Sequence, residues 1–231
     1  MKYCLFIPTT PTHFKNLDKI LALYKIGTVQ PDEIIISISK SNEISKNEMD
    51  YIENKYNCKL MKHKKLMLAG PNRQESIKSE SDIIIYHDSD DYPHKQRIEI
   101  IKYFFEQNNI VMLNHSYSKN YNEEDIIIQN ISIIKCEDIY GLYFPNNILK
   151  DCIKYCGAYG GGWNIPICAG PVSIKKEVLN DIKWKDRHEL SYSPMWNNLN
   201  YKGAEDYEFC MEVLYHFKKS ILIDSPIYFI G

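Results

Sequence analysis

Three carboxylates crowd the end of one short apolar segment. Ile83–Tyr86 is followed directly by His87-Asp88-Ser89-Asp90-Asp91. In an extended chain, residues two apart point the same way, so Asp88 and Asp90 can share one cation. Hard oxygen ligands suit Mg²⁺ or Mn²⁺, and phosphate oxygens often complete the coordination shell. The segment therefore predicts a divalent-metal site, and an acidic turn before a helix is the competing interpretation.

A second acidic pair, Glu205-Asp206, opens an amphipathic segment after Gly203-Ala204. Acids in a first helical turn are favoured by the helix dipole, so a capping role explains the pair by itself. A carboxylate at that place is also suited to act as a general base toward a hydroxyl group. The two interpretations stay open at this point.

Arg73 is the third candidate, in Gly70-Pro71-Asn72-Arg73 near a predicted helix start. Backbone N–H groups and a guanidinium there suit a phosphate or a nucleobase, and a solvated surface arginine is the competing interpretation. The histidines beside the acidic cluster, His87 and His94, are interpreted as polar neighbours. Lesser candidates for a metal or for ring stacking are His188, His216, Trp163, Trp184 and Trp196, although core packing is the more frequent fate of tryptophan.

The elements that must position these residues alternate in the first half of the chain. Short apolar runs predict strands, and amphipathic runs with capping signals predict helices. Strands are predicted at Lys2–Ile7, Glu33–Ser39, Cys58–Met61, Asp82–His87 and Ile110–Leu113, and helices at Leu17–Tyr24, Ser45–Tyr56, Pro71–Ser79 and Lys95–Gln107. Alternation of this kind predicts a mostly parallel sheet covered by helices on both faces. Ligands of such sheets bind outside the carboxyl ends of the strands, where Pro8–Pro11, Ser39–Ser41 and Asp88–Asp91 are expected to meet.

The second half has a different character. Asp125–Ile134 is β-rich and predicts an antiparallel portion. Ser173–Leu179 is interpreted as a short helix after a strand, and Lys183–Asn200 as a long loop of the kind that is often functional. Ala204–His216 predicts a helix and Ile221–Phe229 a final strand. The fold class is therefore α/β, with a mostly parallel sheet flanked by helices and a smaller antiparallel portion.

Composition and charge narrow the function classes. The 231 residues are 44% hydrophobic and 25% charged with a net charge of −2, as expected of one globular domain. Acids and bases are interspersed, so we expect no nucleic-acid partner. The N-terminal apolar run is too short for a signal peptide, and no segment reaches the ~20 apolar residues of a membrane span. We expect a soluble, cytoplasmic protein with reduced thiols, since its seven cysteines are scattered. The abundance of Ile, Lys, Asn and Tyr is typical of AT-rich genomes.

Taken in order, these segments resemble the inverting GT-A glycosyltransferases, family two in the common classification. Phe6–Thr10 resembles the opening strand and nucleotide loop of that family, and Gly70–Arg73 its glycine-to-arginine segment. His87–Asp91, followed by Pro93 and Arg97, resembles its DxDD segment. Further matches are Cys168–Pro171 with Lys175–Leu179, which resemble the acceptor-side strand and helix, and Gly203–Glu208, which resembles the ED motif.

The resemblance implies a role for each matching residue. It implies a single GT-A domain over 1–231, in which 1–115 bind the nucleotide and 116–231 the acceptor. Asp206 would be the catalytic base, with Glu205 as the alternative, and Asp90 with Asp88 would ligate Mn²⁺ or Mg²⁺. Contacts with the nucleotide-sugar would come from Pro8, Thr9, Thr10, Ser39, Arg73, Asp88, Ser89 and Gly170. The implied activity is hexosyl transfer from a nucleoside-diphosphate sugar, UDP-linked, to an acceptor hydroxyl of a glycan or another molecule.

The sequence departs from the family at two places. An acid that often reads the base is replaced by Ser37-Ile38-Ser39, and the QxxRW motif of processive members is absent. A single-addition enzyme is therefore favoured over a polymer synthase. Two other classes stay open: a nucleotidyltransferase, disfavoured because Pro8–His13 has no glycine, lysine or arginine, and a non-catalytic glycan-binding protein, disfavoured by the intact acids.

Overall fold

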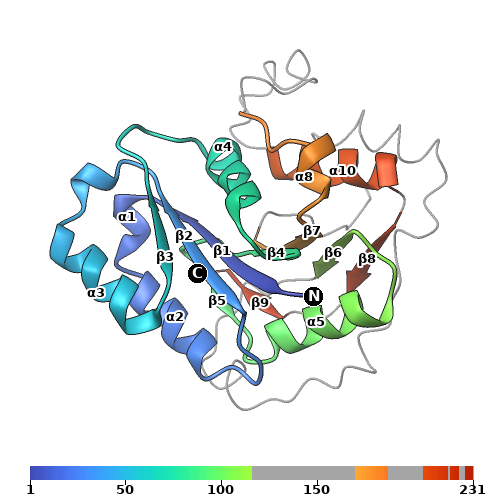
Figure 1. The fold of residues 1–231 in the computed structure, drawn as a ribbon, viewed down its shortest axis with the longest axis horizontal. Coiled ribbons are helices and arrows are strands. Elements are labelled where there is room, and N and C mark those ends of the chain that lie inside the picture. Colours follow the sequence, from blue (N-terminus) through green and yellow to red (C-terminus); the bar gives the residue numbers. More distant parts are fainter. Residues whose placement is uncertain (116–169, 187–204, 218, 224–226, 231) are drawn as a thin grey trace.

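A twisted sheet with helices on both faces forms the centre of the molecule (Figure 1). The computed structural model describes residues 1–115, 170–186, 205–217, 219–223 and 227–230. The strand order is β3-β2-β1-β4-β7-β6-β8. The bounds are β1 Tyr3–Thr9, β2 Glu33–Ile38, β3 Lys59–Lys62, β4 Ile83–Tyr86, β6 Met112–His115, β7 Val172–Lys175 and β8 Ser220–Ile223. A second sheet of two antiparallel strands pairs β5 Tyr92–Pro93 with β9 Tyr228–Phe229.

One strand in the described part of the main sheet, β7, runs opposite to its neighbours. β1 runs parallel to β2 and β4, and β2 runs parallel to β3. β7 is antiparallel to both β4 and β6, whereas β6 and β8 are parallel. The carboxyl ends of β1, β2 and β4 therefore lie at one edge, as the sequence predicts. The predicted α/β architecture, mostly parallel with a smaller antiparallel portion, is confirmed.

Alternate residues of the strands bury against different helices. Leu5 and Ile7 of β1 belong to a core that includes residues of α2, α3 and α5. Cys4 and Phe6 belong to a second core, with residues of α8 and α10. The helices are α1 Pro11–Phe14, α2 Leu17–Lys25, α3 Lys46–Tyr56, α4 Ala69–Gln74, α5 Arg97–Gln107, α8 Val178–Asp181 and α10 Glu205–Phe217, with 3₁₀ turns η1 Ser41–Glu43 and η2 Glu75–Lys78. A sheet buried on both faces explains the continuous apolar runs of its strands.

Three element predictions need correction. Val172–Lys175 is a strand, because it is hydrogen-bonded between β4 and β6. Of the predicted helix Ser173–Leu179, only Val178 and Leu179 are helical, as the start of α8. The predicted strand Ile221–Phe229 is two strands in two different sheets, β8 and β9. The helix expected from Pro71 begins at Ala69 and tightens into the 3₁₀ turn η2 after Gln74.

The capping signal predicted for one helix is confirmed. Ser45 and Glu48 form the predicted capping box at the start of α3. Cys4, Cys58 and Cys210 are buried free thiols. In the described part of the chain, no helix has the length and apolar character needed to cross a membrane. The predictions for Asp125–Ile134 and for most of Lys183–Asn200 lie outside the described residues.

Candidate functional site

The three loops expected to meet do lie at the carboxyl edge of the sheet. The amide of Ser39, after β2, donates to the Thr9 carbonyl at 3.0 Å, and the amide of His87, after β4, donates to the Phe6 carbonyl at 3.0 Å. Pro8 and Thr9 are buried as part of β1, and Thr10 is half-buried. Ser39 is fully buried, and its hydroxyl accepts the Met67 N–H at 2.8 Å. The side chain of Ser39 therefore holds the segment that leads into α4.

The acidic segment after β4 is a tight turn. The Asp91 amide donates to the Asp88 carbonyl at 3.2 Å, which closes a β-turn over Asp88–Asp91. Ser89 is buried within it, and Asp90 is exposed. The segment is therefore a turn, not the extended strand on which the shared direction of Asp88 and Asp90 is predicted. Asp88 instead directs its carboxylate toward α4.

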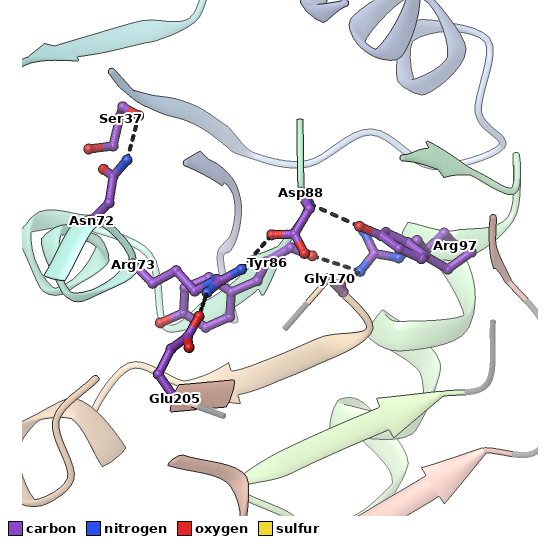
Figure 2. A network of polar contacts seen from close by, with 9 residues as sticks. Ser37, Asn72, Arg73, Tyr86, Asp88, Arg97, Gly170 and Glu205 are labelled. Atoms are coloured by element: carbon purple, nitrogen blue, oxygen red, sulfur yellow. Dashed lines mark hydrogen bonds and ion pairs between the residues drawn. The ribbon is translucent and has the colours of Figure 1, made fainter. Parts of the chain in front are cut away.

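Arg73 is the centre of the polar network (Figure 2). It is 6% exposed, so it is not the solvated surface arginine of the competing interpretation. Nη2 donates to Asp88 Oδ1 at 2.8 Å, and Nη1 donates to Glu205 Oε1 at 3.2 Å. Burial opposes the charge, but the carboxylates of Asp88, Glu205 and Asp206 outweigh it and raise the pKa of Arg73 above its usual range. One guanidinium thus joins the turn after β4 to the first turn of α10.

Trp184 holds Arg73 in place. The guanidinium lies over the indole ring, 5.3 Å from the ring centroid. The indole stacks on Phe209 of α10 at 3.9 Å, and its Nε1–H donates to the Tyr86 hydroxyl at 2.8 Å. Trp184 is 3% exposed and belongs to the second core. It therefore packs in the core, the more frequent fate of tryptophan. The cation and the aromatic face add a stabilising contact beneath the ion pairs.

Two glycines lie where a side chain would collide. A Cβ on Gly70 would be 1.9 Å from the Lys185 carbonyl oxygen, so the start of α4 depends on glycine for its contact with the segment after α8. A Cβ on Gly170 would be 2.0 Å from the Tyr228 hydroxyl. The structure therefore gives Gly170 a packing requirement, in addition to the donor-sugar contact that the resemblance implies.

The remaining sequence candidates divide clearly. Asp206 stands beside Glu205 in α10, half-buried and close enough to influence the Arg73 charge. His87 and His94 are buried neighbours of the turn, as the sequence interpretation favours. His216 is exposed near the end of α10. His188, Trp163 and Trp196 lie outside the described residues.

The predicted metal site can be compared with the carboxylates that the structure places near the turn after β4. Among the described residues, no three His, Cys, Asp or Glu side chains gather as a ready-made metal cage. Mg²⁺ and Mn²⁺ sites that hold phosphates need only one or two carboxylates, however. Exposed Asp90 offers one such carboxylate, and Asp88 has one oxygen engaged by Arg73. The acids after β4 therefore fit a metal whose other ligands come from a bound diphosphate.

Two buried residues beside Asp88 were not predicted from the sequence. Arg97, which donates to the Tyr86 carbonyl, was not expected to be buried, and Tyr228, which accepts the Asp88 N–H, was not a candidate. Arg97 lies on the apolar face of α5, four residues before Ile101 and seven before Phe104. A lone cation at that spacing is a signal that predicts a buried polar role. Tyr228 belongs to a two-residue strand and carries no such signal.

Comparison with solved structures places this architecture in a known fold. No protein-family model matches the sequence, and no curated protein matches it. S. aureus TarS 1-349 superposes with a TM-score of 0.67 at 17% identity, over 100% of this chain and 60% of that one. The same protein with UDP-GlcNAc gives a TM-score of 0.63 at 17% identity, over 99% and 58%. Glucosyl-3-phosphoglycerate synthase from Mycobacterium tuberculosis, in complex with Mn²⁺, UDP and glucosyl-3-phosphoglycerate, gives a TM-score of 0.56 at 10% identity. The match covers 98% of this chain and 71% of that one.

These matches give the chain the GT-A fold, which the sequence resemblance implies. The chain spans about 60% of the length of TarS 1-349. At 10% to 17% identity the likeness concerns the fold. The roles of individual residues therefore rest on their own geometry.

Proposed function

We propose that this protein is an inverting glycosyltransferase that uses a nucleoside-diphosphate sugar. One observation carries the proposal: in a GT-A sheet, Arg73 connects the acidic turn after β4 with the acid pair that begins α10. The first position suits the diphosphate of a donor, and the second suits a base facing an acceptor. We further propose that residues 1–115 hold the nucleotide and that 116–231 supply the acceptor side.

In the proposed reaction, Asp206 accepts the proton of the acceptor hydroxyl. The hydroxyl oxygen attacks C1 of the donor sugar, the bond from C1 to the diphosphate oxygen breaks, and the nucleoside diphosphate leaves. A direct displacement of this kind inverts C1. Asp206 is proposed as the base from its place in the ED motif, and Glu205, whose carboxylate accepts a hydrogen bond from Arg73, is the alternative. Arg73 in turn offers a fixed positive charge beside the place where negative charge develops.

Asp90 and Asp88 are the proposed ligands of Mn²⁺ or Mg²⁺. When bound, the metal supplies charge neutralisation for the leaving diphosphate. The Mn²⁺ in the complex of glucosyl-3-phosphoglycerate synthase supports the proposal of a divalent metal. The residues proposed to line the nucleotide and the donor sugar are Pro8, Thr9, Thr10, Ser39, Ser89 and Gly170.

A UDP-linked donor is proposed because the solved complexes of TarS contain UDP-GlcNAc or UDP. Ser39 does not reach out to read a base, since its hydroxyl is committed to Met67. Base recognition therefore depends on other groups at this edge. The acceptor is proposed only as a hydroxyl-bearing molecule.

The test is a screen of nucleotide-sugars for thermal stabilisation and for hydrolysis with Mn²⁺ present. We expect a UDP-sugar to stabilise the protein and to be hydrolysed slowly. Asp206→Asn should abolish transfer while UDP still binds, and Asp181→Asn, which alters an exposed acid of α8, should retain full activity. If no nucleotide or nucleotide-sugar stabilises the protein, the proposal fails.

The same screen separates the competing classes. A nucleotidyltransferase would release pyrophosphate from a nucleoside triphosphate and a sugar phosphate. A glycan-binding protein would be stabilised by glycans without turnover. Full activity of the Asp206→Asn variant would instead remove that residue from the role of base.

A further inference from the structure

A second arginine, Arg97 of α5, lies on the side of Asp88 opposite Arg73 (Figure 2). It is fully buried. Its Nη2 donates to the carbonyl oxygens of Tyr86 at 2.8 Å and Gly170 at 2.6 Å. Its Nε donates to His115 Nε2 at 3.1 Å, and its Nη1 donates to the Tyr24 hydroxyl. None of these hydrogen-bond partners among the described residues carries a negative charge.

The two carbonyls that Arg97 joins belong to different parts of the site. Tyr86 is the last residue of β4, two positions before Asp88. Gly170 stands two positions before β7, the strand that is antiparallel to β4. A single guanidinium therefore connects the exit of β4 with the entrance of β7. A planar group with donors in fixed directions fixes the distance between two carbonyls more closely than a flexible ammonium does.

Tyr228 completes the same assembly from the small sheet. Its ring lies 4.9 Å from the Arg97 guanidinium carbon, a cation–π contact. Its hydroxyl accepts the backbone N–H of Asp88 at 3.0 Å. The same hydroxyl is so close to Gly170 that a Cβ there would be 2.0 Å away. Tyr228 therefore contacts Arg97, Asp88 and Gly170 together.

We propose that Arg97 and Tyr228 are positioning residues for the donor site, which fix the backbone of Asp88 relative to Gly170. This inference rests on the proposed function, because Asp88 and Gly170 are assigned there to the donor. The geometry supports it in two steps. Arg97 sets the ends of β4 and β7, and Tyr228 then fixes the amide of Asp88, the first residue of the turn.

The role has a measurable consequence. Asp88 directs one carboxylate oxygen to Arg73, so a rotation of its backbone would move that oxygen and alter the acids offered to a metal–diphosphate. Groups that orient a ligating carboxylate typically change metal affinity or activity by about 10- to 100-fold when they are removed. Loss of the Tyr228 hydroxyl should therefore weaken donor binding more than it alters the fold.

Tyr228→Phe is the test variant, because it keeps the ring over Arg97 and removes only the hydroxyl. We expect UDP affinity, measured by calorimetry with Mn²⁺, to fall about 10-fold. The KM for the donor should rise while the KM for the acceptor stays unchanged. Tyr3→Phe is the matched control, since Tyr3 is equally buried and its hydroxyl contacts the Lys102 carbonyl instead. Arg97→Lys keeps the positive charge but loses the planar guanidinium with its donors in fixed directions. It should weaken UDP binding at least as much as Tyr228→Phe does.

Amide hydrogen exchange gives a second measurement that needs no ligand. The Asp88 amide should exchange faster in Tyr228→Phe than in the wild type, and Tyr3→Phe should leave it unchanged. Unaltered UDP affinity and unaltered Asp88 exchange in Tyr228→Phe would overturn the positioning role. A wild-type protein that binds no nucleoside diphosphate would overturn the proposed function. The exchange rate of the Asp88 amide would then still test whether the Tyr228 hydroxyl holds that amide.

Discussion

Two buried arginines flank Asp88, and their surroundings have opposite electrostatic character (Figure 2). Arg73 is held by the carboxylates of Asp88 and Glu205. Arg97 is surrounded by carbonyl, hydroxyl and imidazole groups, none of which carries a negative charge. Arg73 therefore has partners that an incoming anion or cation would compete for, whereas Arg97 has partners that belong to the framework. The difference assigns binding and chemistry to the first arginine and architecture to the second.

Replacement of Arg97 by methionine gives the largest expected effect, on stability. The substitution removes the guanidinium donor from the Tyr86 and Gly170 carbonyls, and it also removes one hydrogen bond each from the Tyr24 hydroxyl and the His115 ring. Since each buried unsatisfied group costs about 1–3 kcal/mol, we expect a loss of about 4 kcal/mol or more in the free energy of unfolding. Urea denaturation followed by circular dichroism measures it. Lys102→Met on the same helix is the control, because the Lys102 side chain is 39% exposed and its ion pair with Glu106 lies at the surface.

A small loss in Arg97→Met, under about 1 kcal/mol, would show that the neutral groups find other partners or water. The contrast between the two arginines would then disappear. If the loss is intermediate, the double variant Arg97→Met with Tyr228→Phe separates the contribution of the Arg97–Tyr228 contact from the rest of the loss. Residues in contact give non-additive changes in unfolding free energy.

Replacement of Arg73 by lysine should act on turnover instead. An ammonium is a point charge that cannot hold the carboxylates of Asp88 and Glu205 in the paired geometry of a guanidinium. We expect about a 100-fold loss of transfer, the usual cost of one preorganised electrostatic contact, with a much smaller change in unfolding free energy. Initial rates with a UDP-sugar measure it. Turnover within about threefold of the wild type would contradict an electrostatic role for Arg73.

Gly170→Ala tests the packing between the two networks. The new Cβ would lie 2.0 Å from the Tyr228 hydroxyl, so the tyrosine must shift away from Asp88. Overpacking of this kind costs about 1–3 kcal/mol. Thermal unfolding gives the stability change, and the Asp88 amide should exchange faster as the hydroxyl moves. An alanine that is tolerated without either change would mean that the contact relaxes elsewhere.

The sequence predicts the framework of this site better than its internal contacts. Local patterns suffice for β1, β2 and β4, whose carboxyl ends place Thr9, Ser39 and Asp88 at one edge. The identity of Ser173 as a strand residue depends on β4 and β6, which are distant in sequence, so its local helical pattern misleads. The contact of Arg73 with Glu205 spans 132 positions and has no local signature. The resemblance to GT-A enzymes supplies the order of the motifs but not the arginine that connects them.

The smallest expected effect is a pH dependence that arises at His87, beside Arg97. Nε2 contacts the Asp91 carbonyl oxygen at 3.2 Å, so it carries the proton, and Nδ1 accepts from the Tyr24 hydroxyl at 2.9 Å. Burial, the Arg97 charge and His115 keep the pKa of His87 well below its usual value. The folded protein therefore leaves His87 neutral at a pH where the unfolded chain takes up a proton.

The sign follows from this proton difference. The contribution of His87 to stability is complete above the unfolded pKa of about 6.5, and it is lost as the pH falls below that value. The slope of unfolding free energy between pH 6.5 and 5.5 should include up to about 1.4 kcal/mol per pH unit from this residue. His87→Gln should flatten the slope by that amount, as measured by urea denaturation across this pH range. An unchanged slope would mean that His87 takes up its proton at the same pH in the folded protein as in the unfolded chain, and that burial and the Arg97 charge do not hold the ring neutral.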